Sequence, residues 1–329
     1  MRWSPPLARS LSAVAITAAV SVAVPSLGSP ARIAPVAVRA VLVGGSPDRV
    51  AVGPTGVWVG DLGHLSRVDA ATDRVVHVTG ATTPIAVAAD QVWSGVFDEP
   101  DAVARLDPTT TQVMARIQLG GAPAAIAIGF GAVWVLDSSA VLTRIDPTTD
   151  SVTTRVPLGG MEPAVAPGEE IGAVGFGVAA GPDAVWATGR SIDNHQSLLW
   201  RVDPTTDAVL AAPLPVDCAA LAGGPAGVWG SCGTAQRIET GSTLSDKGVD
   251  ALDGVAVNGT SAWALGRSAL VTRLDAGTGA VLATYSAPAG AEGIAVGANA
   301  IWLAAPHLHE PSESGIGTLL RLAVPGIGP

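Results

Sequence analysis

Lysine is almost missing from this chain of 329 residues, because Lys247 is the only one and arginine carries the rest of the positive charge. Charged residues make up only 14% of the sequence, and the formal net charge is −10. A protein this acidic, without a cluster of basic residues, binds nucleic acid or an anionic membrane surface poorly. The composition therefore excludes nucleic acid as the expected partner.

Cysteine is equally scarce, with Cys218 and Cys232 as the only two. The chain has no C-x-x-C, G-x-G-x-x-G, Walker or G-x-S-x-G motif, so no cofactor and no nucleophile elbow is predicted. Both cysteines lie in one repeat, on either side of an expected hairpin at 223–226. No histidine or third cysteine lies near them in sequence, so a disulfide is favoured over a reactive or metal-binding role.

The N-terminus has the layout of a secretory signal peptide. Arg2 and Arg9 precede an apolar run from Leu11 to Val24, which is shorter than the roughly 20 residues of a membrane-spanning helix. We expect residues 1–30 to be the signal and 31–329 to be a single secreted domain without a membrane-inserted part; the alternative is an uncleaved membrane anchor. The bias towards Ala, Val and Arg is typical of a bacterial protein.

The most informative feature that is present is a tryptophan that follows an apolar residue seven times, about 40 residues apart. These tryptophans are Trp58, Trp93, Trp134, Trp186, Trp229, Trp263 and Trp302. After a polar gap, each copy continues with an arginine, an apolar residue and usually an acid. The arginines are Arg67, Arg105, Arg144, Arg201, Arg237, Arg273 and Arg321. Seven such units predict an all-β fold, a seven-bladed β-propeller.

The third repeat shows how one blade is built. It predicts strands at 124–128, 132–136, 141–145 and 151–158, separated by Gly-rich or Asp-rich turns. Asp146 and Pro147 suit the first two positions of a type I turn. The repeat thus predicts a blade of four antiparallel strands.

The two ends of the chain predict how the ring closes. The seventh repeat stops after its third strand, near 319–324, whereas residues 37–45 read like the fourth strand of the third repeat. We therefore expect the N-terminal strand to complete the last blade, which also removes an exposed sheet edge. A monomer is expected.

The repeated Val-Trp-Val, Arg-Ile-Asp-Pro-Thr-Thr and Pro-Leu-Gly-Gly units resemble those of the YncE-like and YVTN-repeat seven-bladed propellers, which are common among secreted bacterial proteins. The resemblance covers nearly all of residues 31–329. It implies the propeller fold but no single function, because such folds serve many roles.

Residues that recur in every blade meet seven equivalent environments, and one active site has no use for seven copies. The tryptophans are therefore expected to pack between neighbouring blades, with a carbohydrate-stacking ring as the alternative. The arginines and their acids share one face of a strand. We expect them to form ion pairs within or between blades, and the alternative is a rim that binds anions.

Function is expected where the repeat is interrupted. The second-to-third-strand loops and the blade-to-blade connections emerge on one face, the insertion face, and all four insertions fall there, at 95–102, 160–175, 188–197 and 305–318. The opposite face, the turn face, has only short turns. The binding candidates on the insertion face are Asp98, Glu99, Asp101, Glu162, Glu169, Glu170, Asp193, His195, His307, His309, Glu310 and Glu313, with His64 in the matching loop of the first blade.

These residues leave three functions open. The first is a binding or scaffold propeller for a peptide, glycan or protein. The second is a metal-assisted lyase or hydrolase, with His307 and His309 as ligands and a carboxylate completing the site. This alternative follows a more distant resemblance to virginiamycin B lyase-like propellers, whose His and Glu residues cannot be matched here one by one. The third is a sensor or assembly module for a separate partner.

Overall fold

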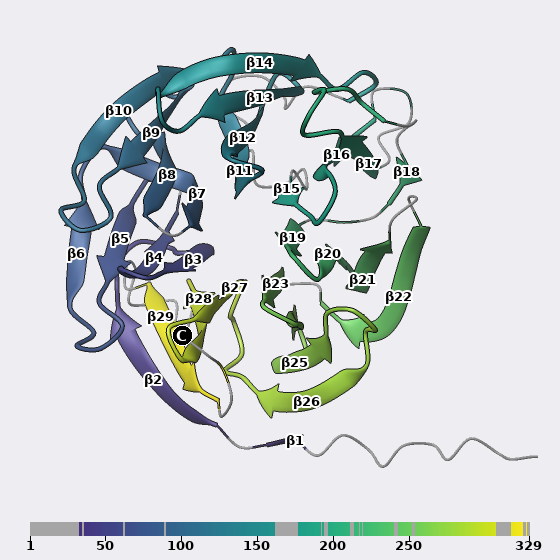
Figure 1. Ribbon diagram of the computed structural model, residues 1–329. Helices are drawn as coiled ribbons and strands as arrows, with labels where there is room; N and C mark the ends of the chain where they lie inside the picture. The colour runs from purple at the N-terminus through teal and green to yellow at the C-terminus, as the bar shows by residue number, and fades with distance from the viewer. Residues whose placement is uncertain are drawn as a thin grey trace, which may run out of the picture. The chain divides into compact units, whose positions relative to one another are not determined.

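The computed structural model describes residues 33–34, 36–61, 63–88, 90–161, 177–191, 193, 197–210, 214–216, 218, 220–239, 243–251, 254–306, 317–324 and 327. Residues 32–329 form one compact unit, in which seven antiparallel sheets are arranged as a ring (Figure 1). The predicted seven-bladed all-β propeller is confirmed. The described residues include no helix that is long and apolar enough to cross a membrane.

Each blade has four strands, which we describe from the centre of the ring outwards. The innermost strands are β3 (Arg49–Gly53), β7 (Ala81–Ala88), β11 (Pro123–Gly129), β15 (Gly177–Ala180), β19 (Ala220–Gly224), β23 (Gly254–Asn258) and β27 (Gly293–Gly297). The second strands are β4 (Gly56–Gly60), β8 (Gln91–Val96), β12 (Ala132–Asp137), β16 (Val185–Arg190), β20 (Gly227–Cys232), β24 (Ser261–Gly266) and β28 (Ala300–Ala305).

The outer half of each blade follows the same order. The third strands are β5 (Leu65–Val68), β9 (Ala102–Leu106), β13 (Val141–Asp146), β17 (Ser197–Val202), β21 (Thr234–Glu239), β25 (Leu270–Asp275) and β29 (Thr318–Ala323). The outermost strands are β6 (Val75–Val78), β10 (Val113–Gln118), β14 (Ser151–Pro157), β18 (Leu214–Pro215), β22 (Thr243–Asp250), β26 (Val281–Ser286) and β2 (Ala37–Leu42).

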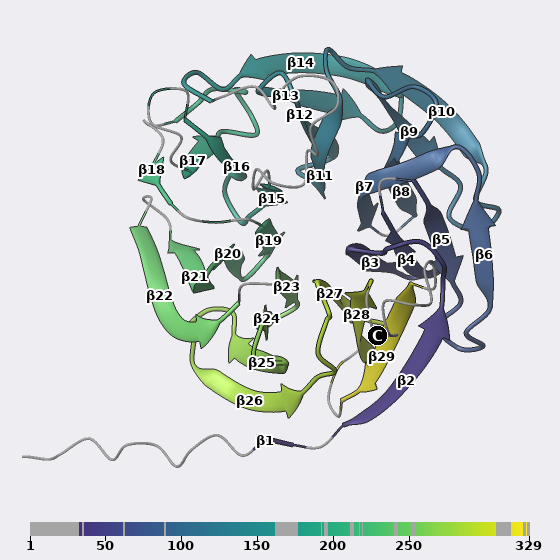
Figure 2. The same ribbon diagram turned by 180° about the vertical axis from the view of Figure 1, so that it is seen from behind.

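The ring closes through the N-terminal strand, as the sequence predicted. Strand β2 pairs antiparallel with β29, from Ala37 opposite Ala323 to Leu42 opposite Thr318. The sequence did not indicate the preceding strand β1 (Ile33–Ala34), which pairs parallel with β26 of the sixth blade. The N-terminal segment therefore runs along the outer edges of blades 6 and 7, as both ribbon views show (Figures 1 and 2).

A transverse row of three residues recurs in all seven blades. The repeat tryptophan on the second strand lies opposite the repeat arginine on the third, as in Trp134 and Arg144. On its other side, the same tryptophan lies opposite an alanine of the innermost strand. These alanines are Ala51, Ala86, Ala127, Ala179, Ala222, Ala256 and Ala295. Each of these alanines precedes its tryptophan by seven residues. The repeated Ala and Trp spacing could therefore have predicted which residue lies opposite each tryptophan.

The tryptophans are buried between blades. The seven repeat tryptophans are at most 2% exposed. Each belongs to a separate cluster that combines side chains of its own blade and of the next. Trp134, for example, packs with Val185 and Val202 of blade 4, and Trp186 packs with Val228 and Ile238 of blade 5. Burial of so large a side chain at every blade boundary gives each seam its own small core.

Among the described side chains, no repeat arginine forms an ion pair with the acid that follows it in the repeat. Those acids cap their own turns: Asp107 Oδ1, for example, accepts from the N–H groups of Thr109 and Thr110 at 2.8 and 2.6 Å. These bonds lower the pKa of the Asp107 carboxyl below its ordinary value. Two of the arginines pair instead with the acid at the last turn position of the next blade, as in Arg105–Asp150 at 2.7 Å.

Candidate functional site: the insertion face

The strand order of the blades agrees with the expected insertion face. The described loops between second and third strands and the described connections between blades all lie on the same side of the ring. Of the candidates, Asp98, Glu99, Asp101, Asp193 and His64 lie in described parts of these loops. The remaining candidates lie outside the described residues, namely Glu162, Glu169, Glu170, His195, His307, His309, Glu310 and Glu313.

The acids of the second blade lie at the outer rim of this face. Glu99 forms an ion pair with Arg116 and accepts a hydrogen bond from Gln118 Nε2 at 2.9 Å. Asp98 Oδ1 lies 3.4 Å from Arg116 Nη1. Because Arg116 and Gln118 belong to β10, the outermost strand, this loop folds outwards over its own blade. These carboxylates are therefore held near the edge of the blade, away from the ring's centre.

Phe97 begins the same loop and was missed by the sequence reasoning. Its side chain is 63% exposed, the highest value among the large apolar residues of the described chain. Aromatic side chains are enriched where proteins bind partners, since they supply much contact area at small entropic cost. In the sequence, only its position at the start of an insertion, next to three acids, could have indicated that Phe97 is a binding residue.

In the first blade, Asp61 organises the loop that carries His64. Its carboxylate accepts hydrogen bonds from the N–H groups of Ser46, Gly63 and His64 at 2.6–2.7 Å. Burial opposes ionisation of this carboxyl, but the hydrogen bonds outweigh it, so the pKa of Asp61 lies below its ordinary value. Gly45 approaches so closely that a Cβ there would lie 2.2 Å from Asp61 Oδ2. Asp61 thus ties the incoming connection to the loop.

Histidine takes two different positions in the described chain. His64 is 70% exposed, and its Nδ1 lies 3.2 Å from Asp61 Oδ1. His77 is on the outermost strand β6, where its Nδ1 is 2.9 Å from Ser66 Oγ. Within the residues that the structure describes, no group of three His, Cys, Asp or Glu side chains is arranged to hold a metal ion. The pair proposed as metal ligands, His307 and His309, lies outside those residues.

The innermost strands surround the ring's centre with small and apolar side chains. In their described residues, the only charged side chain is that of Arg49, whose Nη1 lies 3.2 Å from Asp48 Oδ2. Burial raises the pKa of Asp48 above its ordinary value, although Arg49 acts in the opposite direction. Arg49 begins β3 and Asp48 precedes it, so this ion pair lies at the insertion-face end of the innermost strand of the first blade.

Asp137 is a buried carboxyl on the insertion face, at the end of β12. The residue is 1% exposed, and its Oδ1 accepts from the N–H groups of Ser139 and Val141 at 2.9 and 3.2 Å. Its Oδ2 has no hydrogen-bond partner among the described residues. Burial raises the pKa of Asp137, against the opposing effect of the N–H groups of Val141, Ser139 and Gly120 and of the charge of Arg155.

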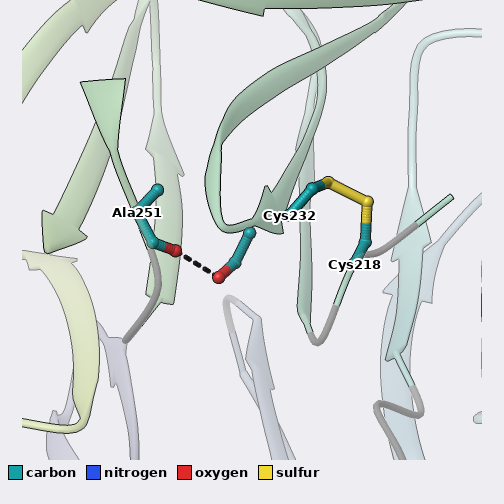
Figure 3. Close-up of a disulfide and its surroundings, with 4 residues drawn as sticks. Cys218, Cys232 and Ala251 are labelled. Carbon is teal, nitrogen blue, oxygen red and sulfur yellow. Dashed lines mark hydrogen bonds between the residues drawn. A yellow bond between two sulfur atoms is a disulfide. The ribbon is translucent and has the colours of Figure 1, made fainter. Parts of the chain in front are cut away.

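The predicted disulfide is present between Cys218 and Cys232 (Figure 3). Cys218 lies in the connection that enters blade 5, and Cys232 ends β20. The neighbouring Ser231 Oγ donates to the carbonyl of Ala251, in the connection that leaves the blade. The tip of the β20–β21 hairpin thus holds both connections of blade 5.

No family model matches the sequence, and no curated protein matches it. Solved structures do match. Hydrazine synthase of Kuenenia stuttgartiensis is 15% identical, with a TM-score of 0.62 over 85% of this chain and 96% of that chain. The WD40 domain of Neurospora crassa Pan2 is 10% identical, with a TM-score of 0.59 over 85% and 89%. BamB of Moraxella catarrhalis is 13% identical, with a TM-score of 0.51 over 85% and 84%. At such identities, the chain shares the propeller fold with these proteins.

Proposed function

We propose that this chain is a secreted bacterial propeller of the YncE-like kind, which binds a peptide, glycan or protein through its insertion face and performs no chemistry itself. The observation that carries the proposal is the difference between the two faces. All four long insertions belong to the insertion face. The turn face carries tight five-residue turns such as 107–111, closed by the bond from Thr111 N to Asp107 O at 2.9 Å. Loops on a rigid ring are the usual place for binding residues.

Secretion is supported by two features. Residues 1–30 have the order of basic, apolar and breaking segments that a signal peptide has. The disulfide Cys218–Cys232 fits an oxidising compartment, since cytosolic proteins rarely keep such bonds. N-terminal sequencing of the protein from culture medium tests this part, and a mature chain that begins near residue 31 is the expected result.

Phe97 supports binding on the outer part of the insertion face. The exposed ring stands beside a carboxylate cluster that Arg116 and Gln118 hold in place. A rigid aromatic anchor with polar neighbours is the arrangement that partner-binding surfaces favour. The candidates Glu169, Glu170, Asp193, His195, His307, His309 and Glu310 belong to the other insertions of the same face.

The test is to use the purified protein as bait in the culture medium of the source organism and against peptide and glycan arrays. One variant replaces 162–175, 192–196 and 307–316 by short Gly-Ser linkers, which leaves β16, β17 and Gly317 intact, and carries Phe97→Ala. The matched control carries Thr109→Arg, Thr148→Arg and Thr205→Arg, which alter three exposed turns of the turn face. Both variants must keep the wild-type unfolding midpoint.

We expect every specific ligand to be lost from the insertion variant and retained by the turn-face control. Ligands that survive in the insertion variant but disappear with the three arginines would place binding on the opposite face and overturn the proposal. Turnover of a captured ligand by the wild-type protein would overturn the absence of chemistry.

A further inference from the structure

Five of the seven seams between blades are tied by the repeat arginine. In each case, the guanidinium of one blade reaches the turn between the third and fourth strands of the next blade. The bonds are Arg67 Nη1 to Thr109 O at 2.9 Å, Arg105 to Asp150 at 2.7 Å, Arg144 to Asp207 at 3.0 Å, Arg237 Nε to Ala276 O at 3.0 Å and Arg321 Nη1 to Ala70 O at 2.9 Å. These contacts run around the ring in one direction.

Two arginines stay within their own blade. Arg201 of blade 4 pairs with Asp183 of blade 4 at 2.7 Å, and its buried Nε has no partner among the described residues. Arg273 of blade 6 donates from Nε to Ser261 Oγ of blade 6 at 2.9 Å. In the described chain, the arginine tie is thus missing at the seam between blades 4 and 5 (seam 4–5) and at that between blades 6 and 7 (seam 6–7).

At both exceptions the turn of the next blade departs from the repeat. The turn that Arg201 would reach belongs to blade 5, where Glu-Thr-Gly-Ser-Thr at 239–243 replaces the Asp-Pro-Thr-Thr-Asp found at 203–207. Arg144 binds the last residue of that pattern, Asp207, and position 243 is a threonine. At seam 6–7 the turn does not exist, because the third and fourth strands of blade 7 come from opposite ends of the chain.

Seam 6–7 has a different tie. The N-terminal segment pairs with both sides of this seam, since β1 bonds to β26 of blade 6 and β2 bonds to β29 of blade 7. Both ribbon views show the segment passing from one blade to the other (Figures 1 and 2). Backbone pairing thus joins the two blades where the arginine does not.

Seam 4–5 is crossed by the connection that holds Cys218. The N–H of Val216 donates to the carbonyl of Ser197 in blade 4 at 2.8 Å. Two residues later, Cys218 is bonded covalently to Cys232 of blade 5 (Figure 3). The connection between the two blades is therefore held to blade 4 by the hydrogen bond of Val216 and to the end of β20 in blade 5 by the disulfide of Cys218.

We propose that the Cys218–Cys232 disulfide replaces the missing arginine tie and makes seam 4–5 the redox-sensitive point at which the ring opens. A dithiol reductant supplies two electrons and two protons. The S–S bond breaks, Cys218 and Cys232 become thiols, and the dithiol becomes a disulfide. The connection then keeps its peptide bonds and its hydrogen bond to Ser197 of blade 4, but it loses its cross-link to the end of β20 in blade 5.

The experiment is hydrogen exchange of the folded, full-length secreted protein with and without dithiothreitol, and of the variant Cys218→Ala/Cys232→Ala. We expect exchange of the strands on both sides of the seam, β16–β17 and β19–β20, to rise roughly ten-fold or more in either case. The strands of blades 2 and 3, which an arginine ties, serve as the internal control and are expected to keep their rates. If the double variant does not fold, reduction of the folded wild-type protein supplies the same comparison.

A graft tests the replacement itself. Residues 239–243 are changed to Asp-Pro-Thr-Thr-Asp, which offers Arg201 the carboxylate that Arg144 finds in Asp207. In this background, reduction is expected to leave exchange at seam 4–5 within about two-fold of the oxidised protein. The matched control graft, Asp-Pro-Thr-Thr-Asn, keeps the turn but lacks the charge, so it should stay as sensitive as wild type. Faster exchange spread evenly over all blades, no change on reduction, or equal rescue by both grafts would overturn the proposal.

Discussion

Arg144 of blade 3 forms an ion pair with Asp207 of blade 4, with 3.0 Å between Nη1 and Oδ1. Thr154 Oγ1 donates to the second carboxylate oxygen of Asp207 at 2.7 Å, and the Arg144 guanidinium lies 5.3 Å from the centre of the Trp134 ring. Arg144 therefore contacts the buried tryptophan of its own blade and the turn of the next blade at the same time. Asp207 adopts a positive φ of 58°, a conformation that the turn imposes and Asp tolerates.

Loss of this pair should weaken the protein measurably, because the two side chains are only 26% and 16% exposed. We expect Asp207→Asn to lower the free energy of unfolding by about 1–3 kcal/mol, since it leaves Arg144 without its counter-charge. A double-mutant cycle with Arg144→Met, followed by urea denaturation, measures the coupling. The matched cycle on the more exposed Arg201–Asp183 pair should give the smaller value, and a larger one would contradict the role given to the seam contact.

The buried alanine opposite Trp186 should tolerate no larger side chain. Ala179 is 2% exposed and lies opposite Trp186, within the cluster of seam 4–5. Ala179→Leu is expected to cost about 1–3 kcal/mol, because the added carbons would overpack a filled space. Ala40→Leu on the exposed outermost strand β2 is the control, and thermal unfolding of both variants gives the comparison. Equal midpoints for the two variants would show that this space is not filled.

The fold was readable from the sequence because each blade repeats the same physical solution. The equivalents of Trp134 and Arg144 recur in every blade, so one repeat predicts the register of all seven. The partner of Arg144 was not readable, because Asp207 lies 63 residues away in the next blade. Strand β1 was equally hidden, since two residues carry no periodicity and only the edge of β26 gives Ile33 a partner.

The sequence predicted which face carries the candidate residues, but it did not predict how their side chains are oriented. The insertions identified the face and the acids, yet Asp98 and Glu99 turn outwards because Arg116 on β10 attracts them. Asp61 was overlooked because a single Asp in a short turn is ordinary. Its importance comes from Ser46, which is 15 residues away and reaches it only when β3 pairs with β4. Charge partners on separate strands set these positions, and no local pattern encodes them.

The N-terminal strand should be required for a closed ring. A chain that begins at residue 43 lacks β1 and β2, which exposes the edge of β29 and removes Val41 from the core. An exposed edge of this kind invites pairing with another chain. We expect this chain to elute as oligomers and to unfold at a lower temperature, whereas a chain that begins at residue 32 should match the mature protein. Size-exclusion chromatography with thermal unfolding distinguishes them, and a stable monomer from residue 43 would contradict closure by β2.

Asp61 should stabilise the protein at neutral pH and lose this effect in acid. Because its pKa in the folded state lies below the ordinary value, the carboxylate contributes stability above pH ~4, and the contribution falls as the pH drops through the folded-state pKa. Asp61→Asn should therefore unfold more easily than wild type at pH 7, because its amide N–H would face the N–H of Ser46. The difference should close below pH ~4. A constant difference from pH 7 to pH 3 would show that ionisation of Asp61 is not involved.

Ionisation of Asp137 should have the opposite effect on stability from that of Asp61. Burial raises its pKa in the folded state, so the ionised carboxyl costs stability at neutral pH, and this cost is relieved as the pH falls through the raised folded-state pKa. Asp137→Asn keeps the Oδ1 acceptor for Ser139 and Val141 but carries no charge. Its unfolding midpoint should exceed that of wild type by roughly 2 °C or more at pH 7, and the gain should shrink towards pH ~4. Thermal unfolding of both proteins across this range provides the measurement. A gain that grows in acid would reverse the sign and show that Asp137 stabilises the ring as a carboxylate.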